Sequence, residues 1–144
     1  MEKKINIRVY GILINSQKEV LLSDEKYRDV EFTKFPGGGL EWGEGTKETL
    51  IREFQEELDI DVEIGELFYC TDFFQQSAFS ENDQLISIYY IISCSDETKI
   101  TTEKTEIHTK GKEHHRWMPL NHLKEEIFKF PIDKIVARKL NELL

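Results

Sequence analysis

Apolar and polar residues alternate over residues 5–14, and from residue 11 onward apolar residues occupy both faces. This pattern predicts a β-strand that is buried on both sides toward its end. Later segments that alternate or are largely apolar predict further strands, over 19–22, 32–35, 62–74, 84–94 and 116–118. The polar segments between them predict loops and turns, over 15–18, 23–31, 75–83 and 96–112.

Two other segments repeat apolar residues at the spacing of an α-helix. The first is predicted to begin at Thr46, a good N-cap residue, and to end near Leu58. The second covers residues 132–144, after a short helix capped by Asn121. Strands and helices in this order predict an α/β fold in which a mixed β-sheet packs against helices. With 144 residues and no internal repeat or linker, the chain is predicted to form a single domain over residues 1–144.

The predicted helix over residues 46–58 has two faces of different chemistry. At about 100° per residue, the other apolar side chains fall within about 60° of Phe54 around the helix axis. This core stripe consists of Leu50, Ile51, Phe54 and Leu58. The adjoining face carries the carboxylates of Glu53, Glu56 and Glu57. Carboxylates this close repel one another, and a divalent cation is the obvious partner. Arg52 lies four positions from both Glu48 and Glu56, so we expect it to hold carboxylates in place.

A plainer interpretation of this helix is an ordinary solvated surface, because glutamate favours helices and acidic pairs are common on exposed helix faces. The context separates the two interpretations. A glycine-rich turn over residues 37–39, then Glu44, then the acidic helix follow one another at a fixed spacing. Glycine allows tight or positive-φ turns, and it is the fixed spacing of these three features that favours a functional site over an ordinary surface helix.

Composition narrows the class of partner. The chain has 19 basic and 28 acidic residues and a formal net charge of −9. This balance argues against a nucleic-acid polymer as the partner, because phosphate backbones are bound by basic surfaces. A small phosphorylated ligand remains compatible with the charge, since a bound metal ion reverses the local field.

The cellular location of the protein is predicted from the segments that contain its cysteines and from the composition of its first ten residues. The two cysteines, Cys70 and Cys94, lie in strand-like runs, which favours two buried thiols over a disulfide. The first ten residues lack the apolar core of a signal peptide. No apolar run approaches the length of about 18 residues that a membrane span needs. We therefore expect a cytoplasmic protein with no membrane partner.

The spacing of the glycine turn and the acidic helix resembles the Nudix box, G-x5-E-x7-R-E-U-x-E-E-x-G-U, in which U is a bulky apolar residue. The match begins at Gly38, covers 23 of the 144 residues and ends at Ile60, with Phe54 as the first apolar U. One position differs, because Asp59 stands where the box has glycine. That glycine ends the helix with a positive φ. Aspartate tolerates the left-handed region better than most residues, so we expect the turn to survive.

The resemblance implies a Nudix-like α/β/α sandwich with a mixed β-sheet between helices, and hydrolysis of a nucleoside diphosphate linked to another group. The bond broken would be a P–O–P link, with Mg²⁺ or Mn²⁺ as the cofactor. By position, the resemblance implies metal ligands at Glu53, Glu56 and Glu57. Glu53 would also act as, or position, the general base, while Arg52 would orient the carboxylates and Glu44 would be a structural or outer acid.

Other consequences of the resemblance concern the substrate and the assembly. Gly38 and Gly39 would let the backbone approach metal and phosphate. The small size of the chain favours a (d)NTP such as 8-oxo-dGTP as substrate, and family members often dimerise, which leaves a homodimer open by analogy. Glu113 lies where many family members supply one more metal-binding acid, and a surface acid is the alternative there. The neighbouring His114 and His115 point to opposite faces of a strand, which favours structural or surface roles.

Two other functions share this resemblance. A non-hydrolytic Nudix domain would sense a nucleotide by binding it, but such a domain need not retain every acid of the box. An isomerase of the isopentenyl diphosphate type needs an additional acid–base pair, often with a cysteine. Because Cys70 and Cys94 have no evident partner in the sequence, the hydrolase remains the leading hypothesis.

Overall fold

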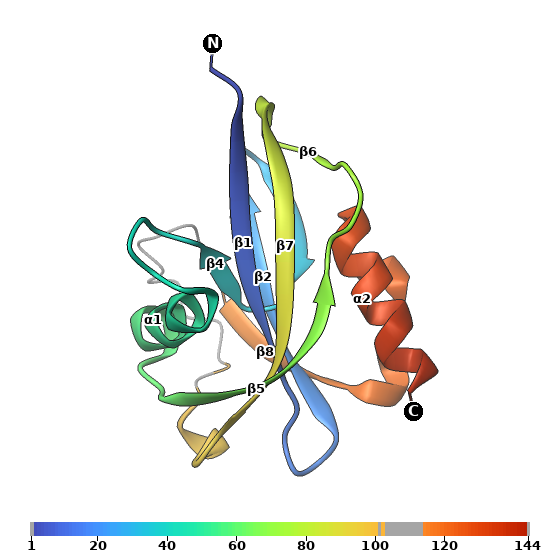
Figure 1. The fold of residues 1–144 in the computed structure, drawn as a ribbon. Coiled ribbons are helices and arrows are strands. Elements are labelled where there is room, and N and C mark those ends of the chain that lie inside the picture. The colour runs from blue at the N-terminus through green and yellow to red at the C-terminus, as the bar shows by residue number, and fades with distance from the viewer. Residues whose placement is uncertain (1, 101, 103–113, 144) are drawn as a thin grey trace. The chain divides into compact units, whose positions relative to one another are not determined.

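The computed structural model describes residues 2–100, 102 and 114–143 (Figure 1). The chain divides into two compact units. The first unit comprises Met1–Ile12 and Gly37–Ser95, and the second comprises Leu13–Pro36 and Asp96–Leu144. Each unit is therefore built from two stretches of chain that are far apart in the sequence.

The first unit contains a five-stranded sheet with the strand order β4-β1-β7-β5, and β6 pairs with β7. Its strands are β1 (Lys4–Leu13), β4 (Gly37–Gly39), β5 (Val62–Cys70), β6 (Gln76–Ser77) and β7 (Ser80–Cys94). β4 is antiparallel to β1, and β5 is antiparallel to β7. The neighbouring strands β1 and β7 run in the same direction in Figure 1. The sheet is therefore mixed, as the sequence predicted.

The helix α1 (Thr46–Leu58) packs on this sheet where β1 carries a glycine. A Cβ atom at Gly11 would lie 2.6 Å from Ile92 Cδ1 and 3.1 Å from Phe54 Cε1. The missing side chain thus lets the helix approach the sheet closely. Leu50 and Phe54 are buried, as the core stripe predicts.

The predicted stripe is wrong at one position, because Ile51 is 42% exposed whereas Thr49 is fully buried. The Thr49 hydroxyl lies within hydrogen-bond distance of two acceptors, Glu44 Oε1 at 2.9 Å and the Gly45 carbonyl at 3.1 Å, and has one proton to donate between them. The loop that precedes the helix therefore covers the Thr49 side of α1. The buried side of the helix leans toward this loop, and Ile51 on the opposite flank is left in solvent.

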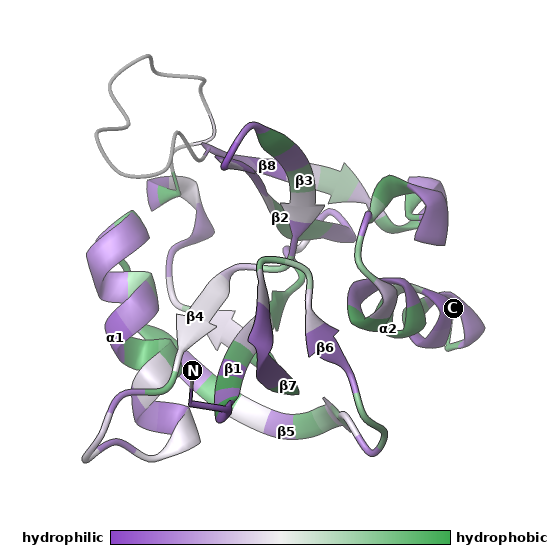
Figure 2. Cartoon of the chain, turned by 90° about the horizontal axis from the view of Figure 1, so that it is seen from above, coloured by the Kyte–Doolittle hydropathy of each residue, from purple (hydrophilic) through white to green (hydrophobic). Residues whose placement is uncertain are grey.

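The second unit contains an antiparallel sheet with the order β3-β2-β8. Its strands are β2 (Glu19–Tyr27), β3 (Val30–Lys34) and β8 (His114–Pro119), followed by the C-terminal helix α2 (Pro131–Glu142). Single 3-10 turns occur over Glu97–Lys99, Leu120–His122 and Glu125–Ile127. Figure 2 shows hydrophilic and hydrophobic colours on different parts of α2, in agreement with the predicted amphipathic helix.

The predicted loop over residues 23–31 is wrong, because β2 continues to Tyr27 and β3 begins at Val30. Arg28 and Asp29, with φ of 51° and 65°, form the two-residue connection between these strands. Two successive positive-φ residues make a turn that suits the twist of a hairpin. Neither residue is glycine or asparagine, so the sequence carried no clear signal for this turn. The predicted loop over 75–83 is also shorter, because it contains β6 and the start of β7.

The two cysteines are not linked by a disulfide. Cys70 ends β5, whereas Cys94 pairs with Val62 at the other end of the same strand. This separation explains why they do not meet. The predicted burial is wrong for Cys70, which is exposed on the last residue of β5.

Together the elements confirm the predicted α/β class, although the strands are divided between two sheets and not collected in one. Within the described residues, no helix combines the length and the apolar composition required to cross a membrane.

Candidate active site

The strand β4 is made entirely of glycine, and this brings its backbone into contact with an acidic side chain of α1. A Cβ atom at Gly38 would lie only 2.3 Å from Glu53 Oε1. The Glu53 carboxylate therefore rests directly on the backbone of β4. Any side chain at Gly38 would displace it, which gives a physical reason for glycine at this position.

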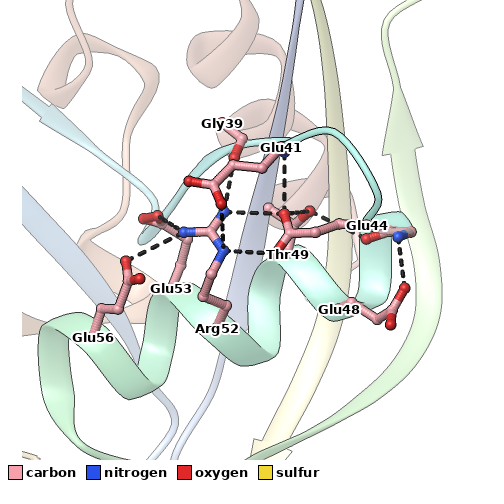
Figure 3. Close-up of polar contacts among 9 residues, drawn as sticks. Gly39, Glu41, Glu44, Glu48, Thr49, Arg52, Glu53 and Glu56 are labelled. Atoms are coloured by element: carbon pink, nitrogen blue, oxygen red, sulfur yellow. Dashed lines mark hydrogen bonds and ion pairs between the residues drawn. The ribbon is translucent and has the colours of Figure 1, made fainter.

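Arg52 connects the acids of this region to the glycine strand (Figure 3). Its Nε donates to Glu44 Oε2 at 2.6 Å, and its Nη2 donates to the Gly39 carbonyl at 3.0 Å and to Glu44 Oε1 at 3.1 Å. Its Nη1 donates to Glu53 Oε2 at 3.1 Å and to Glu56 Oε1 at 3.2 Å. One guanidinium thus forms hydrogen bonds with three carboxylates and one backbone carbonyl, and its Nε also lies 3.7 Å from Glu41 Oε1.

This network perturbs the ionisation of its members. The hydrogen bond from Arg52 is the largest cause that lowers the pKa of Glu44 from 4.5 to about 2, and a backbone hydrogen bond from Glu41 and the Thr49 hydroxyl act in the same direction. The hydrogen bond to Glu44 raises the pKa of Arg52 above its usual value. Both groups are therefore charged over the whole neutral range. Glu44 acts as a fixed anion that anchors the guanidinium.

The predicted pairing of Arg52 with Glu48 is wrong. Glu48 Oε1 instead accepts a hydrogen bond of 2.7 Å from the Gly45 backbone N–H. Gly45 is the N-cap of α1, whereas Thr46, the predicted cap, is the first helical residue. Glu48 thus satisfies a backbone donor at the start of the helix. This leaves Arg52 to the acids on the side of the glycine strand.

The other end of α1 shows what replaces the glycine of the box. Asp59 adopts the left-handed conformation, with φ of 53° and ψ of 46°. Its backbone N–H donates to the Gln55 carbonyl, and the Ile60 N–H donates to the Phe54 carbonyl. These bonds close the helix as a glycine would. The prediction that the turn survives with aspartate is confirmed.

The donor chemistry of the acidic face fits a divalent cation, because Mg²⁺ and Mn²⁺ prefer carboxylate oxygens. Within the described residues, however, no group of three or more acidic, histidine or cysteine side chains converges to hold a metal ion. Arg52 Nη1 supplies the positive charge between Glu53 and Glu56 in this arrangement. The side chain of Glu56 is 58% exposed and is able to turn away from Arg52, while Glu57 lies half-buried one turn beyond Glu53. The predicted ligand Glu113 lies outside the described residues.

The two histidines of β8 lie in surroundings that are typical of residues with a structural role. His114 Nε2 lies 3.3 Å from Asp24 Oδ2 in the second unit, and His115 is only 5% exposed. Arg116 forms an ion pair with the same aspartate, with 2.7 Å between Nε and Oδ2. The two histidines lie on different faces of the sheet, as the sequence predicted, and neither belongs to a metal-binding group among the described residues.

Aromatic side chains of the first unit are divided between core and surface. Tyr89 is 1% exposed, and its ring packs at a tilt against the ring of Tyr10. Phe73 and Phe74 are 40% and 68% exposed, and Trp42, in the loop before α1, is fully exposed.

Arg8 was not among the site residues expected from the sequence. It lies opposite Gly39 in the β1–β4 pairing, and a Cβ atom at Gly39 would lie 3.2 Å from Arg8 Nη1. This neighbour is separated from the glycine turn by about thirty residues of chain. Only the register between β1 and β4 brings it there, so no local sequence pattern could have identified it.

Comparison with known proteins identifies the family of the chain. The family model described as NUDIX domain matches residues 4–139 of the chain. A search of curated proteins finds no significant match.

Many solved structures share the fold. The MutT protein of Methanosarcina mazei Go1 is 20% identical, with a TM-score of 0.72 and coverage of 99% of this chain and 97% of that one. The ORF135 protein of E. coli is 17% identical, with a TM-score of 0.72 and coverage of 98% and 91%. The MutT protein of methicillin-resistant Staphylococcus aureus 252 is 21% identical, with a TM-score of 0.68 and coverage of 99% of both chains. At these identities the likeness supports the fold.

The match to the family model confirms the resemblance drawn from the box. It also confirms the predicted enzyme class, a Nudix pyrophosphohydrolase. Such enzymes act on small molecules in which a nucleoside diphosphate is linked to another group, and they generally use divalent metal ions.

Proposed function

This chain belongs to the Nudix family, and from this premise we propose that it hydrolyses the P–O–P bond of a nucleotide with Mg²⁺ or Mn²⁺ as cofactor. The substrate class that we favour is a (d)NTP, of which 8-oxo-dGTP is an example. The small size of the chain and its acidic character support a small nucleotide over a nucleic-acid polymer.

One observation carries this proposal, the hydrogen-bonded set that Arg52 forms with Glu44, Glu53 and Glu56 beside the Gly39 carbonyl. Here one guanidinium faces four carboxylates, since Arg52 Nε also lies 3.7 Å from Glu41 Oε1. An excess of oxygen donors on rigid elements suits a divalent cation better than it suits a purely structural ion pair.

The ligands that we propose for the cation are Glu53, Glu56 and Glu57, with Glu113 as a further ligand outside the described residues. When bound there, a divalent ion neutralises phosphate charge and lowers the pKa of a bound water.

The side chains themselves have distinct tasks in this proposal. Glu53 accepts the proton of the attacking water, because its carboxylate lies against Gly38 and its Oε2 is held by Arg52. Glu57 lies one turn further along α1 on the same face, and we assign it to the catalytic step as well. Arg52 fixes the orientation of the acids, and Glu44 in turn fixes Arg52. The bare backbone of Gly38 and Gly39 leaves room for the diphosphate to approach.

The experiment begins with a screen of (d)NTPs, ADP-ribose, diadenosine polyphosphates, nucleotide sugars and coenzyme derivatives, with Mg²⁺ or Mn²⁺ and detection of phosphate and pyrophosphate release. On the best substrate, Glu53→Gln is expected to lower kcat by about 100- to 10,000-fold, the range for losing a general base. Glu66→Gln is the matched control, because Glu66 is an exposed glutamate of β5 in the same unit.

Near-wild-type turnover in Glu53→Gln would remove Glu53 from the mechanism. Tight nucleotide binding by the wild type without any released phosphate or pyrophosphate would replace the hydrolase with a nucleotide-sensing domain.

A further inference from the structure

The glycine strand β4 separates two side chains of opposite charge. A Cβ atom at Gly38 would meet the Glu53 carboxylate, whereas a Cβ atom at the next residue, Gly39, would meet the guanidinium of Arg8. Successive residues of a strand face opposite sides of the sheet. The same stretch of bare backbone therefore has an acid on one side and a cation on the other.

Arg8 is held in this position by aromatic neighbours. Its Nε donates a hydrogen bond of 3.2 Å to the Tyr10 hydroxyl, and its guanidinium lies 6.0 Å from the centre of the Tyr10 ring. Tyr10 packs against Tyr89, with 5.0 Å between ring centres, and Tyr89 is buried in the core. The lack of a side chain at Gly37 also admits the Tyr10 ring, since a Cβ there would lie 2.9 Å from Tyr10 Cδ1. The guanidinium is thus oriented before any ligand binds.

The charges around β4 show what this cation could do. Arg52 directs its donors to Glu44, Glu53, Glu56 and the Gly39 carbonyl, so it is committed to holding the acids. A diphosphate that approaches these acids carries negative charge on every phosphate. A guanidinium presents N–H donors in a fork that matches phosphate oxygens. Since β4 ends the strand order of its sheet, a ligand at this edge can reach both faces of the glycine backbone.

We propose that Arg8 binds a phosphate group of the nucleotide across Gly39, on the face of β4 opposite Glu53. This inference rests on the proposed function and deepens it, because it assigns substrate binding to a residue outside the Nudix box. Glu53 and Arg8 would then contact the diphosphate from the two sides of one glycine strand, with Tyr10 as a positioning residue for Arg8.

The test uses the full chain and the nucleotide that the wild type hydrolyses fastest. Arg8→Gln is expected to raise KM by about 10- to 100-fold, the range for a charge-assisted hydrogen bond to an anion, with a smaller change in kcat. Tyr10→Phe removes only the hydroxyl that orients Arg8, and its KM should rise by about two- to tenfold. Arg8→Met is a second neutral variant, and circular dichroism identifies which of the two is folded.

Lys4→Gln is the matched control, because it removes one positive charge from the same strand at an exposed position before the segment paired with β4. Its KM should stay within about twofold of the wild type, the change that a distant exposed charge produces in salt. A folded Arg8 variant with wild-type KM would overturn the inference while leaving the hydrolase intact. An equal rise in KM for Lys4→Gln would also overturn it, because net charge would then be the cause. A wild type that hydrolyses no nucleotide would instead reject the proposed function itself.

Discussion

Each of the two units contains an arginine surrounded by polar partners, but the balance of charge differs. In the first unit Arg52 faces four carboxylates, those of Glu41, Glu44, Glu53 and Glu56. In the second unit Asp24 is one carboxylate between two basic side chains, His114 and Arg116, and it also accepts a hydrogen bond of 2.6 Å from the Thr33 hydroxyl. The first cluster has more acids than cations, whereas the second does not.

This difference is the one that we expect between the proposed ligand site and a structural ion pair. The cluster around Asp24 joins neighbouring strands, since β2 supplies the aspartate, β3 supplies Thr33 and β8 supplies the basic residues. Its charges are satisfied within the sheet. The cluster around Arg52 lies on one helix and on the loop before it, against a strand without side chains. These carboxylates are the ones at which we propose that a divalent cation binds.

The strongest way to break this comparison is to remove each arginine. Arg52→Gln is expected to lower kcat by about 100-fold, because the acids lose the group that fixes their orientation, and misplacement of about 1 Å costs this much. Arg116→Gln should leave kcat within a few-fold of the wild type. Steady-state kinetics on the best nucleotide would measure both, with circular dichroism as a check of folding.

The two arginine variants are matched, since both lose a guanidinium that is paired with a carboxylate. An equal loss of kcat in both variants would show that the two clusters do not differ in function. Full activity in Arg52→Gln would show that the acids do not depend on the guanidinium for their positions.

A second prediction concerns the metal and needs no turnover. At a concentration one hundred times its Kd, Mg²⁺ should stabilise the folded protein by about 2.7 kcal/mol, which corresponds to a rise in Tm of about 5–10 °C for a chain of this size. Thermal unfolding with and without a chelator measures this shift. The double variant Glu56→Gln with Glu57→Gln should lose most of it.

Asp24→Asn is the control for the metal experiment, because it removes an acid from the cluster in the second unit. Its Mg²⁺-dependent shift should equal that of the wild type. A full shift in the double variant would place the bound ion away from the acidic face of α1.

The helix and its acids could be predicted from the sequence because their signals are local. The apolar period together with a capping residue predicted the limits of α1 almost to the residue, although the cap is Gly45 and not Thr46, and the acids follow from the same helical geometry. Asp59 could be judged in advance, since its φ of 53° depends on a conformational preference of one residue type. What failed depends on contacts between one element and another.

Three such failures have the same physical cause. Ile51 is exposed because the preceding loop covers the other flank of α1, and the hairpin at Arg28 forms without glycine because its strands pair along their length. Arg8 reaches Gly39 only through the register of two strands. Periodicity describes one element at a time, whereas these features arise where two elements meet.

The smallest effect that would sharpen the comparison concerns two variants, one in each unit, and how the stability of each depends on pH. Because the pKa of Glu44 is lowered from 4.5 to about 2 in the folded protein, ionised Glu44 stabilises the fold fully above pH 4.5, and this contribution is lost as the pH falls toward 2. Glu44→Gln should therefore lower Tm at neutral pH, and the gap to the wild type should close over this acid range.

The matching pair in the second unit is Glu125 with Arg138, whose guanidinium donates bonds of 3.1 and 3.3 Å to the two carboxylate oxygens and lowers the pKa of Glu125. The sign is the same, so Glu125→Gln should also lose its effect on Tm in acid. Its gap at neutral pH should be smaller, because both side chains are more than a third exposed and water screens them. Thermal melts of both variants from pH 7 to pH 2 measure the two gaps. A larger gap for Glu125→Gln would mean that Glu44 anchors Arg52 only weakly, and the acid-rich cluster would then owe its geometry to the helix alone.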